Sequence, residues 1–275
     1  MAKILFGTAG IPCSTKKQDT VSGIERVAEL GLGAMELEFV YGVNMGLELA
    51  AEVRKVAEKQ DISLSVHAPY YINLNAKERA KLEASKKRIL DSARIGAAAG
   101  AKIIVAHPGF YLGMGSEIAY VSVEGALMKI DEQLKHEGIE IKIGLETTGK
   151  GSQFGSLEEI ATLSNEIDSV YPVIDFSHLH ARGVGCLKEK KDFIKALGTV
   201  DKKFLKDAHF HCSGIKFTEK GERKHLNFDD AGNTLNYKLA IEALKESGVS
   251  GTVICESPNL EEDALKMQKY LRKIT

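Results

Sequence analysis

The chain has 275 residues, of which 44% are hydrophobic and 27% charged, and its formal net charge is −1. A charge so close to zero excludes a global field that attracts nucleic acid, so any such binding must come from a local patch. No apolar run is long enough for a bilayer span or a signal peptide, and four scattered cysteines without a CxxC pair are typical of a reducing compartment. We therefore expect a cytoplasmic protein that makes no contact with a membrane.

Strand-like and helix-like periods alternate along the whole sequence. The expected strands are Ile4–Gly10, Ala34–Phe39, Ile62–Ala68, Lys102–His107, Ile141–Thr147, Tyr171–Asp175, Ala208–Ser213 and Thr252–Glu256. The expected helices are Thr20–Leu30, Glu48–Lys59, Ala76–Ala99, Val121–His136, Leu157–Ile167, Lys191–Leu197, Tyr237–Glu246 and Glu261–Arg272.

Eight strand–helix pairs without a linker-like stretch favour one parallel (β/α)8 barrel, a TIM barrel, formed as a single domain by residues 1–275. A doubly wound parallel sheet is the alternative, but no GxGxxG motif follows the first strand. The glycine-rich segment 149–155 does not match that motif either, and we interpret it as a flexible connector.

The last inward-facing residue of several strands is a histidine or a carboxylate. In the third strand Leu64 and Val66 form the outward apolar face, which leaves His67 pointing into the barrel. The same phase recurs at other strand ends, and the carboxyl ends of barrel strands form the rim where such folds keep their active sites. The rim residues are His67, His107, Glu146, Asp175, His178, His211 and Glu256, with His225 in the loop after the seventh strand.

Imidazoles and carboxylates that converge in one barrel mouth would repel one another or stay unpaired unless a cation joined them. Mixed ligands of this kind suit Zn²⁺, Mn²⁺ or Fe²⁺ and disfavour Ca²⁺. Eight candidate ligands exceed the need of one tetrahedral ion, so we expect two or three ions. Paired ions typically activate a water molecule and hold a phosphoryl group during in-line displacement.

Other inward-facing polar residues have simpler interpretations. We expect Glu36 to form an ion pair within the core, with Lys142 as its partner, and His209 to be a hydrogen-bonded histidine of the barrel core. Glu38 at the rim either supports a ligand or contacts substrate. His180, two residues after His178, is either a loop residue or a support for the ligands.

Five short motifs together resemble the endonuclease IV family of apurinic/apyrimidinic endonucleases, and the similarity covers nearly the whole chain. The motifs are residues 67–74 (HAPYYINL), 105–109 (VAHPG), 145–148 (LETT), 175–178 (DFSH) and 255–258 (CESP). The resemblance implies a TIM barrel with a trinuclear zinc site that cleaves DNA 5′ to an abasic site.

The same resemblance assigns the ligands. It places the first ion on His67, His107 and Glu146, with Glu146 bridging to a second ion as the central catalytic carboxylate. The remaining ligands of the second ion are Asp175, His211 and Glu256, and those of the third are His178 and His225.

The chain departs from the family pattern at two places. The third ion of the family takes an Asp-x-His pair, whereas this segment reads Glu222-Arg-Lys-His225, with Arg223 at the aspartate position. The third ion is therefore lost, held through Glu222, or replaced by the Arg223 cation on a phosphate. The loop at 39–44 lacks the basic residues with which the family penetrates DNA, although Tyr70 matches its minor-groove tyrosine.

Basic residues in the rim loops form either a phosphate-binding ring or a set of solvated loop charges. These residues are Lys16, Lys17, Arg182, Lys188, Lys190, Lys191, Lys216, Lys220, Arg223 and Lys224.

The preferred hypothesis is a monomeric, zinc- or manganese-dependent endonuclease acting on damaged double-stranded DNA, with Tyr70, Arg223 and Lys224 as DNA contacts. One rival is a metal-dependent sugar isomerase or epimerase of the related barrel group, which shares the quartet of Glu146, Asp175, His211 and Glu256. The other is a non-catalytic, damage-sensing barrel.

Overall fold

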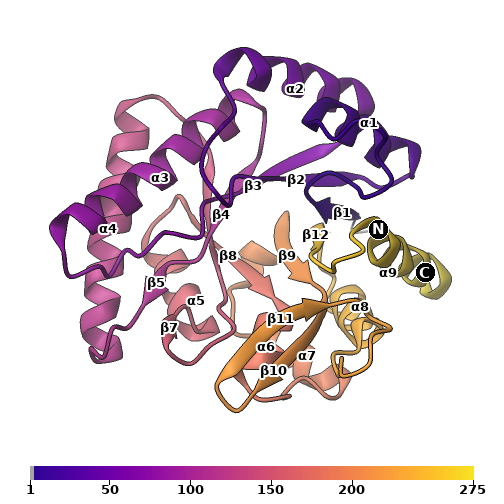
Figure 1. Cartoon of the computed structure of the whole chain (residues 1–275). Helices are drawn as coiled ribbons and strands as arrows, with labels where there is room; N and C mark the ends of the chain where they lie inside the picture. Colours follow the sequence, from indigo (N-terminus) through magenta and orange to yellow (C-terminus); the bar gives the residue numbers. More distant parts are fainter. Residues whose placement is uncertain (1–2) are drawn as a thin grey trace.

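The computed structural model describes residues 3–275, in which eight parallel strands close into a barrel surrounded by helices (Figure 1). The strands are β1 (Ile4–Ala9), β2 (Ala34–Glu38), β3 (Ser63–His67), β4 (Ile103–Ala106), β6 (Lys142–Glu146), β8 (Val170–Asp175), β9 (Ala208–Cys212) and β12 (Gly251–Cys255). Their order around the barrel is β1–β12–β9–β8–β6–β4–β3–β2, and β1 closes the ring on β12 with Ile4 opposite Gly251. The predicted TIM barrel is confirmed.

Helices follow each barrel strand and cover its outer face (Figure 1). They are α1 (Thr20–Glu29), α2 (Leu47–Gln60), α3 (Arg79–Ala98), α4 (Ser116–His136), α5 (Leu157–Glu166), α6 (Phe176–Arg182), α7 (Lys190–Leu197), α8 (Tyr237–Glu246) and α9 (Glu261–Ile274), with a short 3-10 turn at Lys202–Leu205. Local sequence fixes several starts. Ser156 and Glu159 form a reciprocal capping box at α5, and Asp19 accepts a hydrogen bond from the Ser22 amide at α1.

Two small antiparallel sheets lie outside the barrel. One joins β5 (Gly109–Phe110) to β7 (Gln153–Phe154), and the other is a hairpin of β10 (Gly214–Thr218) and β11 (Gly221–Leu226). Segment 149–155 is therefore not a flexible connector, because it contains β7. Arg182 also holds it, since its Nη1 donates to the carbonyl oxygens of Lys150 and Gln153 at 2.7 and 2.9 Å.

The barrel interior has an apolar side and a polar side. The apolar side is a separate cluster made of Ile103, Val105 and Val173. On the polar side Glu36, which is fully buried, accepts hydrogen bonds from Ser65 at 2.6 Å and His209 at 2.9 Å. The expected pair of Glu36 with Lys142 is wrong, because Lys142 reaches outward to Asp207 at 2.7 Å. The predicted core role of His209 is confirmed.

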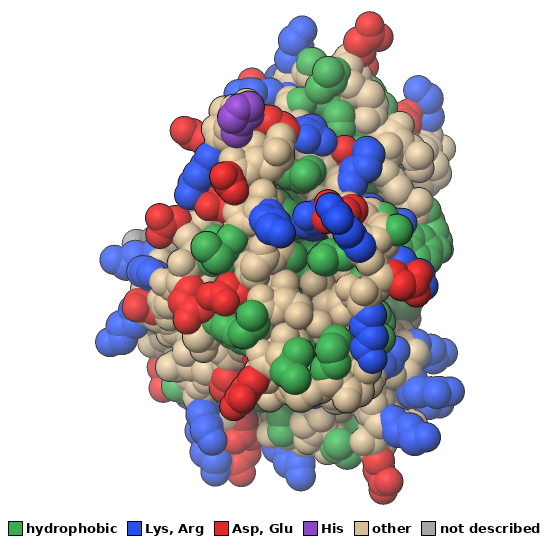
Figure 2. Space-filling model, turned by 90° about the vertical axis from the view of Figure 1, so that its left-hand side faces the viewer, with side chains coloured by type: hydrophobic (Ala, Val, Ile, Leu, Met, Phe, Trp, Pro, Cys, Tyr) green, Lys and Arg blue, Asp and Glu red, His purple; other side chains and the backbone are tan. Residues whose placement is uncertain are grey.

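The outer surface carries charges of both signs. Figure 2 shows Lys and Arg side chains interspersed with Asp and Glu over the face that it presents, as the net charge of −1 suggests. Within residues 3–275, no helix combines the length and apolarity that a membrane crossing requires.

Candidate metal centre

The eight predicted ligands converge at the carboxyl-terminal mouth of the barrel. Most stand at strand ends: His67, Glu146 and Asp175 are the last residues of β3, β6 and β8, His107 and Glu256 directly follow β4 and β12, and His211 lies on β9. The other two come from added elements, since His178 is in the first turn of α6 and His225 is on β11. The alternation of the strands thus brings side chains from the whole length of the chain to one end of the barrel.

Glu146 is the centre of this cluster. Its carboxylate has no solvent exposure, and imidazole nitrogens of four histidines surround it. Oε2 lies 2.7 Å from His107 Nε2 and 3.3 Å from His67 Nε2. Oε1 lies 3.0 Å from His178 Nδ1 and 3.2 Å from His211 Nδ1. Each oxygen therefore faces a different pair of histidines.

The electrostatics of the mouth show how strongly these buried carboxylates depend on nearby positive charge. Burial by itself would raise the pKa of Glu146, but the imidazoles of His107 and His211 hold it well below its usual range. Burial would likewise lower the pKa of His67, yet the hydrogen bond to Glu146 raises it to about 10. The metal-free protein therefore keeps protons on imidazoles that are ordinarily neutral at pH 7.

Two further carboxylates of the mouth have buried oxygens that lack partners. Among residues 3–275, nothing donates a hydrogen bond to Asp175 Oδ2 or Glu256 Oε2. Burial raises the pKa of Asp175 to about 6, and its neighbour Glu256 adds to this rise. Orphaned buried oxygens beside imidazoles fit a bound cation, and this donor set of nitrogen and oxygen suits zinc or manganese.

Backbone carbonyls and one carboxylate orient the histidine rings. His67 Nδ1 lies 2.8 Å from the Ala68 carbonyl oxygen, which can only accept, so Nδ1 carries a proton, and Nε2, which donates to Glu146 in the metal-free protein, is the nitrogen that a cation would bind. His211 has the reverse orientation: Nδ1 faces Glu146 and Glu256, while Nε2 lies 3.0 Å from Glu36 Oε1. Such outer contacts are typical of metal-binding histidines.

His180 is not part of the cluster, although it lies two residues from His178. Its ring is buried on the other side of α6, where Nε2 is 2.9 Å from Thr234 Oγ1 and Nδ1 accepts a hydrogen bond from the Leu187 amide. Burial lowers the pKa of His180 to about 4, with a smaller effect from the Lys188 cation. It is therefore a neutral structural histidine.

The expected DNA contacts lie at the edge of the mouth. Tyr70 is 58% exposed and its ring centroid is 5.7 Å from that of His67. Arg223 and Lys224 are exposed on β11, and Glu38 is exposed at the end of β2. Arg182 does not belong with the free cations of the rim, because three acceptors of segment 148–153 occupy its Nη1.

The sequence did not fix the place of two acidic residues of the centre: Glu36 was expected to pair with Lys142, and Glu222 was one of three alternatives at the third ion. Glu36 faces His211 and not a lysine, and Glu222 joins His178 and His225 in a group whose ligand atoms all lie within 4.8 Å of one another. The signal for Glu36 was present, since Glu36 and His209 both have the inward phase of their strands. For Glu222 the sequence left three alternatives open for the third ion, because the position of its side chain depends on the pairing of β10 with β11.

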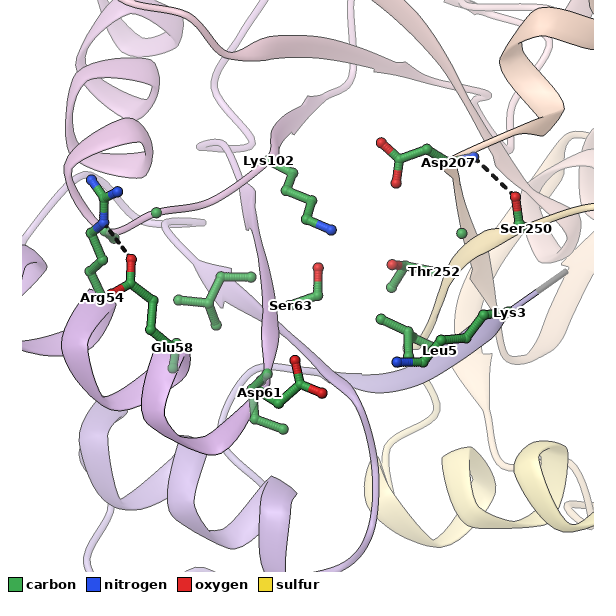
Figure 3. Close-up of a pocket in the computed structure, with 16 residues that line it drawn as sticks. Lys3, Leu5, Arg54, Glu58, Asp61, Ser63, Lys102, Asp207, Ser250 and Thr252 are labelled. Carbon is green, nitrogen blue, oxygen red and sulfur yellow. Dashed lines mark hydrogen bonds and ion pairs between the residues drawn. The ribbon is translucent and has the colours of Figure 1, made fainter.

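A cavity of about 560 Å³ lies at the opposite, amino-terminal end of the strands (Figure 3). Its charged lining includes Lys3, Arg54, Lys102, Glu58, Asp61 and Asp207. Arg54 and Glu58 form an ion pair of 2.9 Å there, and Figure 3 shows cations and carboxylates distributed around the same space. None of the metal-type clusters found in residues 3–275 lies in this cavity.

A closed (β/α)8 barrel with histidines and carboxylates gathered at its carboxyl-terminal mouth defines a TIM barrel with a candidate metal site. Residues 24–274 match the family model described as xylose isomerase-like TIM barrel, and the chain belongs to this family. The match covers seven of the eight barrel strands, from β2 onward, and so includes every predicted ligand.

Two relatives extend the comparison. An uncharacterized protein of Methanocaldococcus jannaschii is 41% identical over 275 residues, covering 98% of each chain. A protein named probable endonuclease 4 from Bacillus subtilis is 29% identical over 210 residues, covering 72% of this chain and 67% of that protein.

Solved structures of proteins with two different named activities share the fold. Endonuclease IV from Thermus thermophilus superposes with a TM-score of 0.70 at 17% identity, covering 97% of this chain and 98% of that one. A D-tagatose 3-epimerase-like protein also reaches 0.70, at 19% identity, covering 97% and 96%. At such identities the likeness shows the fold alone, so the site must distinguish the activities.

Proposed function

We propose that the protein is a metal-dependent endonuclease that hydrolyses the DNA phosphodiester 5′ to an abasic site, acting as a cytoplasmic monomer with a single barrel domain. The observation that carries this proposal is the pair His67 and His107 on Glu146 Oε2, at 3.3 and 2.7 Å. An epimerase quartet of Glu146, Asp175, His211 and Glu256 needs no such pair, whereas a multinuclear hydrolytic centre does. The endonuclease 4 relatives agree with this choice.

In this proposal His67, His107 and Glu146 hold one zinc ion. Asp175, His211 and Glu256, together with Glu146, would hold a second ion, while His178 and His225 would contribute to a third. Manganese can replace zinc, because both accept nitrogen and oxygen ligands. When bound, such ions supply an activated hydroxide and stabilise the negative charge that develops on a transferred phosphoryl group.

The residues of the chain bind and position the DNA around that centre. Glu146 Oε2 faces His67 and Glu146 Oε1 faces His178, so one carboxylate contacts two separate groups of metal-binding side chains. Arg223 and Lys224 on the exposed hairpin provide cations for backbone phosphates, which supply affinity and register without reading sequence. Tyr70, which stands above His67, provides an exposed ring beside the unpaired position of an abasic site.

A metal-dependent sugar epimerase is the second candidate, supported by the D-tagatose 3-epimerase-like structure and by the shared quartet. It predicts one ion per chain and turnover of ketose sugars. A damage-sensing barrel without catalysis predicts tight binding of abasic DNA and no strand cleavage under any divalent ion.

The deciding experiment is cleavage of a duplex with one central abasic site by zinc- or manganese-loaded protein, next to an undamaged duplex and a chelated sample. We expect a nick at the abasic site only, lost on chelation. Glu146→Gln should lower the rate more than about a hundredfold, since outer contacts of ligands alone are worth about ten- to a hundredfold. Glu140→Gln, at an exposed position shortly before β6, is the matched control.

Protein that holds its metals and leaves the abasic duplex intact would rule out the endonuclease. Ketose substrates and equilibrium binding of abasic DNA would then separate the epimerase from the sensor.

A further inference from the structure

We propose that Glu222 is the carboxylate ligand of the third metal position, and that a β-bulge at Arg223 places it there. The inference rests on the metal centre of the proposed function and adds a residue to it. Glu222, His178 and His225 each offer one ligand atom to a group in which all such atoms lie within 4.8 Å of one another.

The bulge is visible in the pairing of the hairpin. Lys216 pairs with Lys224 and the next residue, Phe217, pairs with Glu222, so Arg223 is an extra residue on β11. In a regular strand, residues three apart point to opposite faces, but one inserted residue reverses the phase. Glu222 and His225 therefore share the face that looks into the mouth, while Arg223 is exposed to solvent.

The two histidines both turn the same nitrogen toward Glu222. His178 Nδ1 lies 3.0 Å from the carbonyl oxygen of Thr147, so Nδ1 carries a proton and Nε2 is the nitrogen that a cation would bind. His225 Nδ1 lies 2.6 Å from Ser213 Oγ, whose own hydroxyl is able to donate to the Gly214 carbonyl. Each Nε2 is then a free ligand atom, held in place by a hydrogen bond on the far side of its ring.

The spacing of the ligand atoms suits a shared ion better than direct hydrogen bonds. His178 Nε2 is 3.6 Å and His225 Nε2 is 4.0 Å from the nearest Glu222 oxygen, both beyond ordinary hydrogen-bond length. Ligand atoms around a tetrahedral zinc lie about 3.4 Å apart, given bonds of about 2.1 Å. Glu256 Oε2, a buried oxygen without a hydrogen-bond partner in residues 3–275, lies 3.9 Å from His225 Nε2 on the same side.

Gly149 and Gly221 allow the β10–β11 hairpin to pack closely in this position. The Glu222 amide donates to the Gly149 carbonyl at 2.9 Å, which joins β11 to the loop after β6. A Cβ at Gly149 would lie 2.6 Å from Glu222 Cβ, and one at Gly221 would lie 2.3 Å from the Gly149 oxygen. Such contacts exclude any larger residue, so the close approach that holds the Glu222 carboxylate beside His178 depends on glycine at both positions.

The test is the metal content of the full-length, zinc-loaded protein after dialysis against metal-free buffer. We expect roughly three ions per chain in the wild type and roughly two in Glu222→Gln, which keeps the size of the side chain. The controls are Glu219→Gln, an exposed carboxylate in the turn of the same hairpin, and Arg223→Ala, both of which should keep three. Deleting Arg223 removes the bulge and should give two ions again.

A second readout is the visible absorption of cobalt-substituted protein. In Glu222→Gln this spectrum should lack the absorption of one of the three ions. Circular dichroism checks that the variant folds. Wild type with two ions, or a Glu222→Gln variant that keeps all three with an unchanged cobalt spectrum, would overturn the inference. Cleavage of abasic DNA is scored separately. Three ions with the Glu222 dependence but no nicking would reject the proposed function alone, and nicking by a two-ion protein would reject the Glu222 assignment alone.

Discussion

The two ends of the barrel differ in a way that cavity size does not reveal. The amino-terminal end has a cavity of about 560 Å³, but its exposed cations and carboxylates balance one another, as Arg54 and Glu58 do (Figure 3). At the carboxyl-terminal mouth, Glu146 and Asp175 are completely buried and depend on imidazoles or a cation for charge balance. An uncompensated buried carboxylate is costly, so it marks a functional end more reliably than empty volume does.

Glu36 lies between the two ends, and its replacement should have the largest effect on zinc affinity of any residue that is not itself a proposed ligand. Glu36→Gln removes the negative charge that faces His211 Nε2 at 3.0 Å. We expect zinc affinity to fall about ten- to a hundredfold, as for other outer contacts of metal-binding histidines. Competition with a zinc-binding dye measures this change. Ser65→Ala, which removes a hydrogen bond to Glu36 without touching His211, should cost less, and equal losses in both variants would contradict the assignment.

Burial of His180 should have an intermediate effect on stability, and this effect should depend on pH. Its pKa is about 4 in the folded protein and about 6.5 in an unfolded chain, so below pH 6.5 the unfolded state binds a proton that the folded state refuses. Stability should therefore be lost as pH falls from 6.5 to 4, by up to about 2 kcal/mol after allowance for solvent screening. Urea unfolding of chelated protein should show a flatter pH dependence in His180→Gln than in wild type.

The exposed His136 on α4 supplies the control for that measurement. His136→Gln should leave the pH dependence of unfolding unchanged. If unfolding of His180→Gln shows the same pH dependence as wild type, the acid sensitivity comes from the groups of the metal centre. His180 would then not be the buried neutral histidine that the structure indicates.

The smallest effect should come from the amino-terminal cavity. Lys102→Ala removes an exposed cation from its lining, and a surface change of this kind is expected to alter unfolding free energy by no more than about 0.5 kcal/mol. Metal content and cleavage of abasic DNA should be unchanged. A clear loss of cleavage in this variant would show that the two ends are functionally linked.

The sequence predicted the barrel because period and phase are local properties. Every barrel strand lies where alternation of apolar residues placed it, and the ends differ by a residue or two, where hydrogen bonding and not side-chain pattern decides the boundary. The inward phase of His67 and Glu146 followed from the same alternation. The short helix α6 escaped prediction, because its seven residues are too few for a helical period to be recognised.

Features that depend on contacts between distant segments were not predictable. The bulge at Arg223 is defined by the partner strand β10, and it changes which side chains of β11 face the mouth. The role of Arg182 depends on carbonyl groups of segment 150–153, which carry no side-chain signal. Glu36 was assigned to Lys142 by charge alone, whereas the closed barrel brings it to His209 and His211.

Closure of the barrel also constrains how the chain folds. The parallel pairing of β1 with β12 joins the first strand to the last, so the ring is completed only after nearly the whole chain is available. During synthesis, the edge of β1 stays unpaired until β12 and α9 leave the ribosome, and an open edge of this kind favours association with other chains. A contact of such high sequence separation is slow to form, so closure is expected to limit the folding rate and to be the step at which chaperones act.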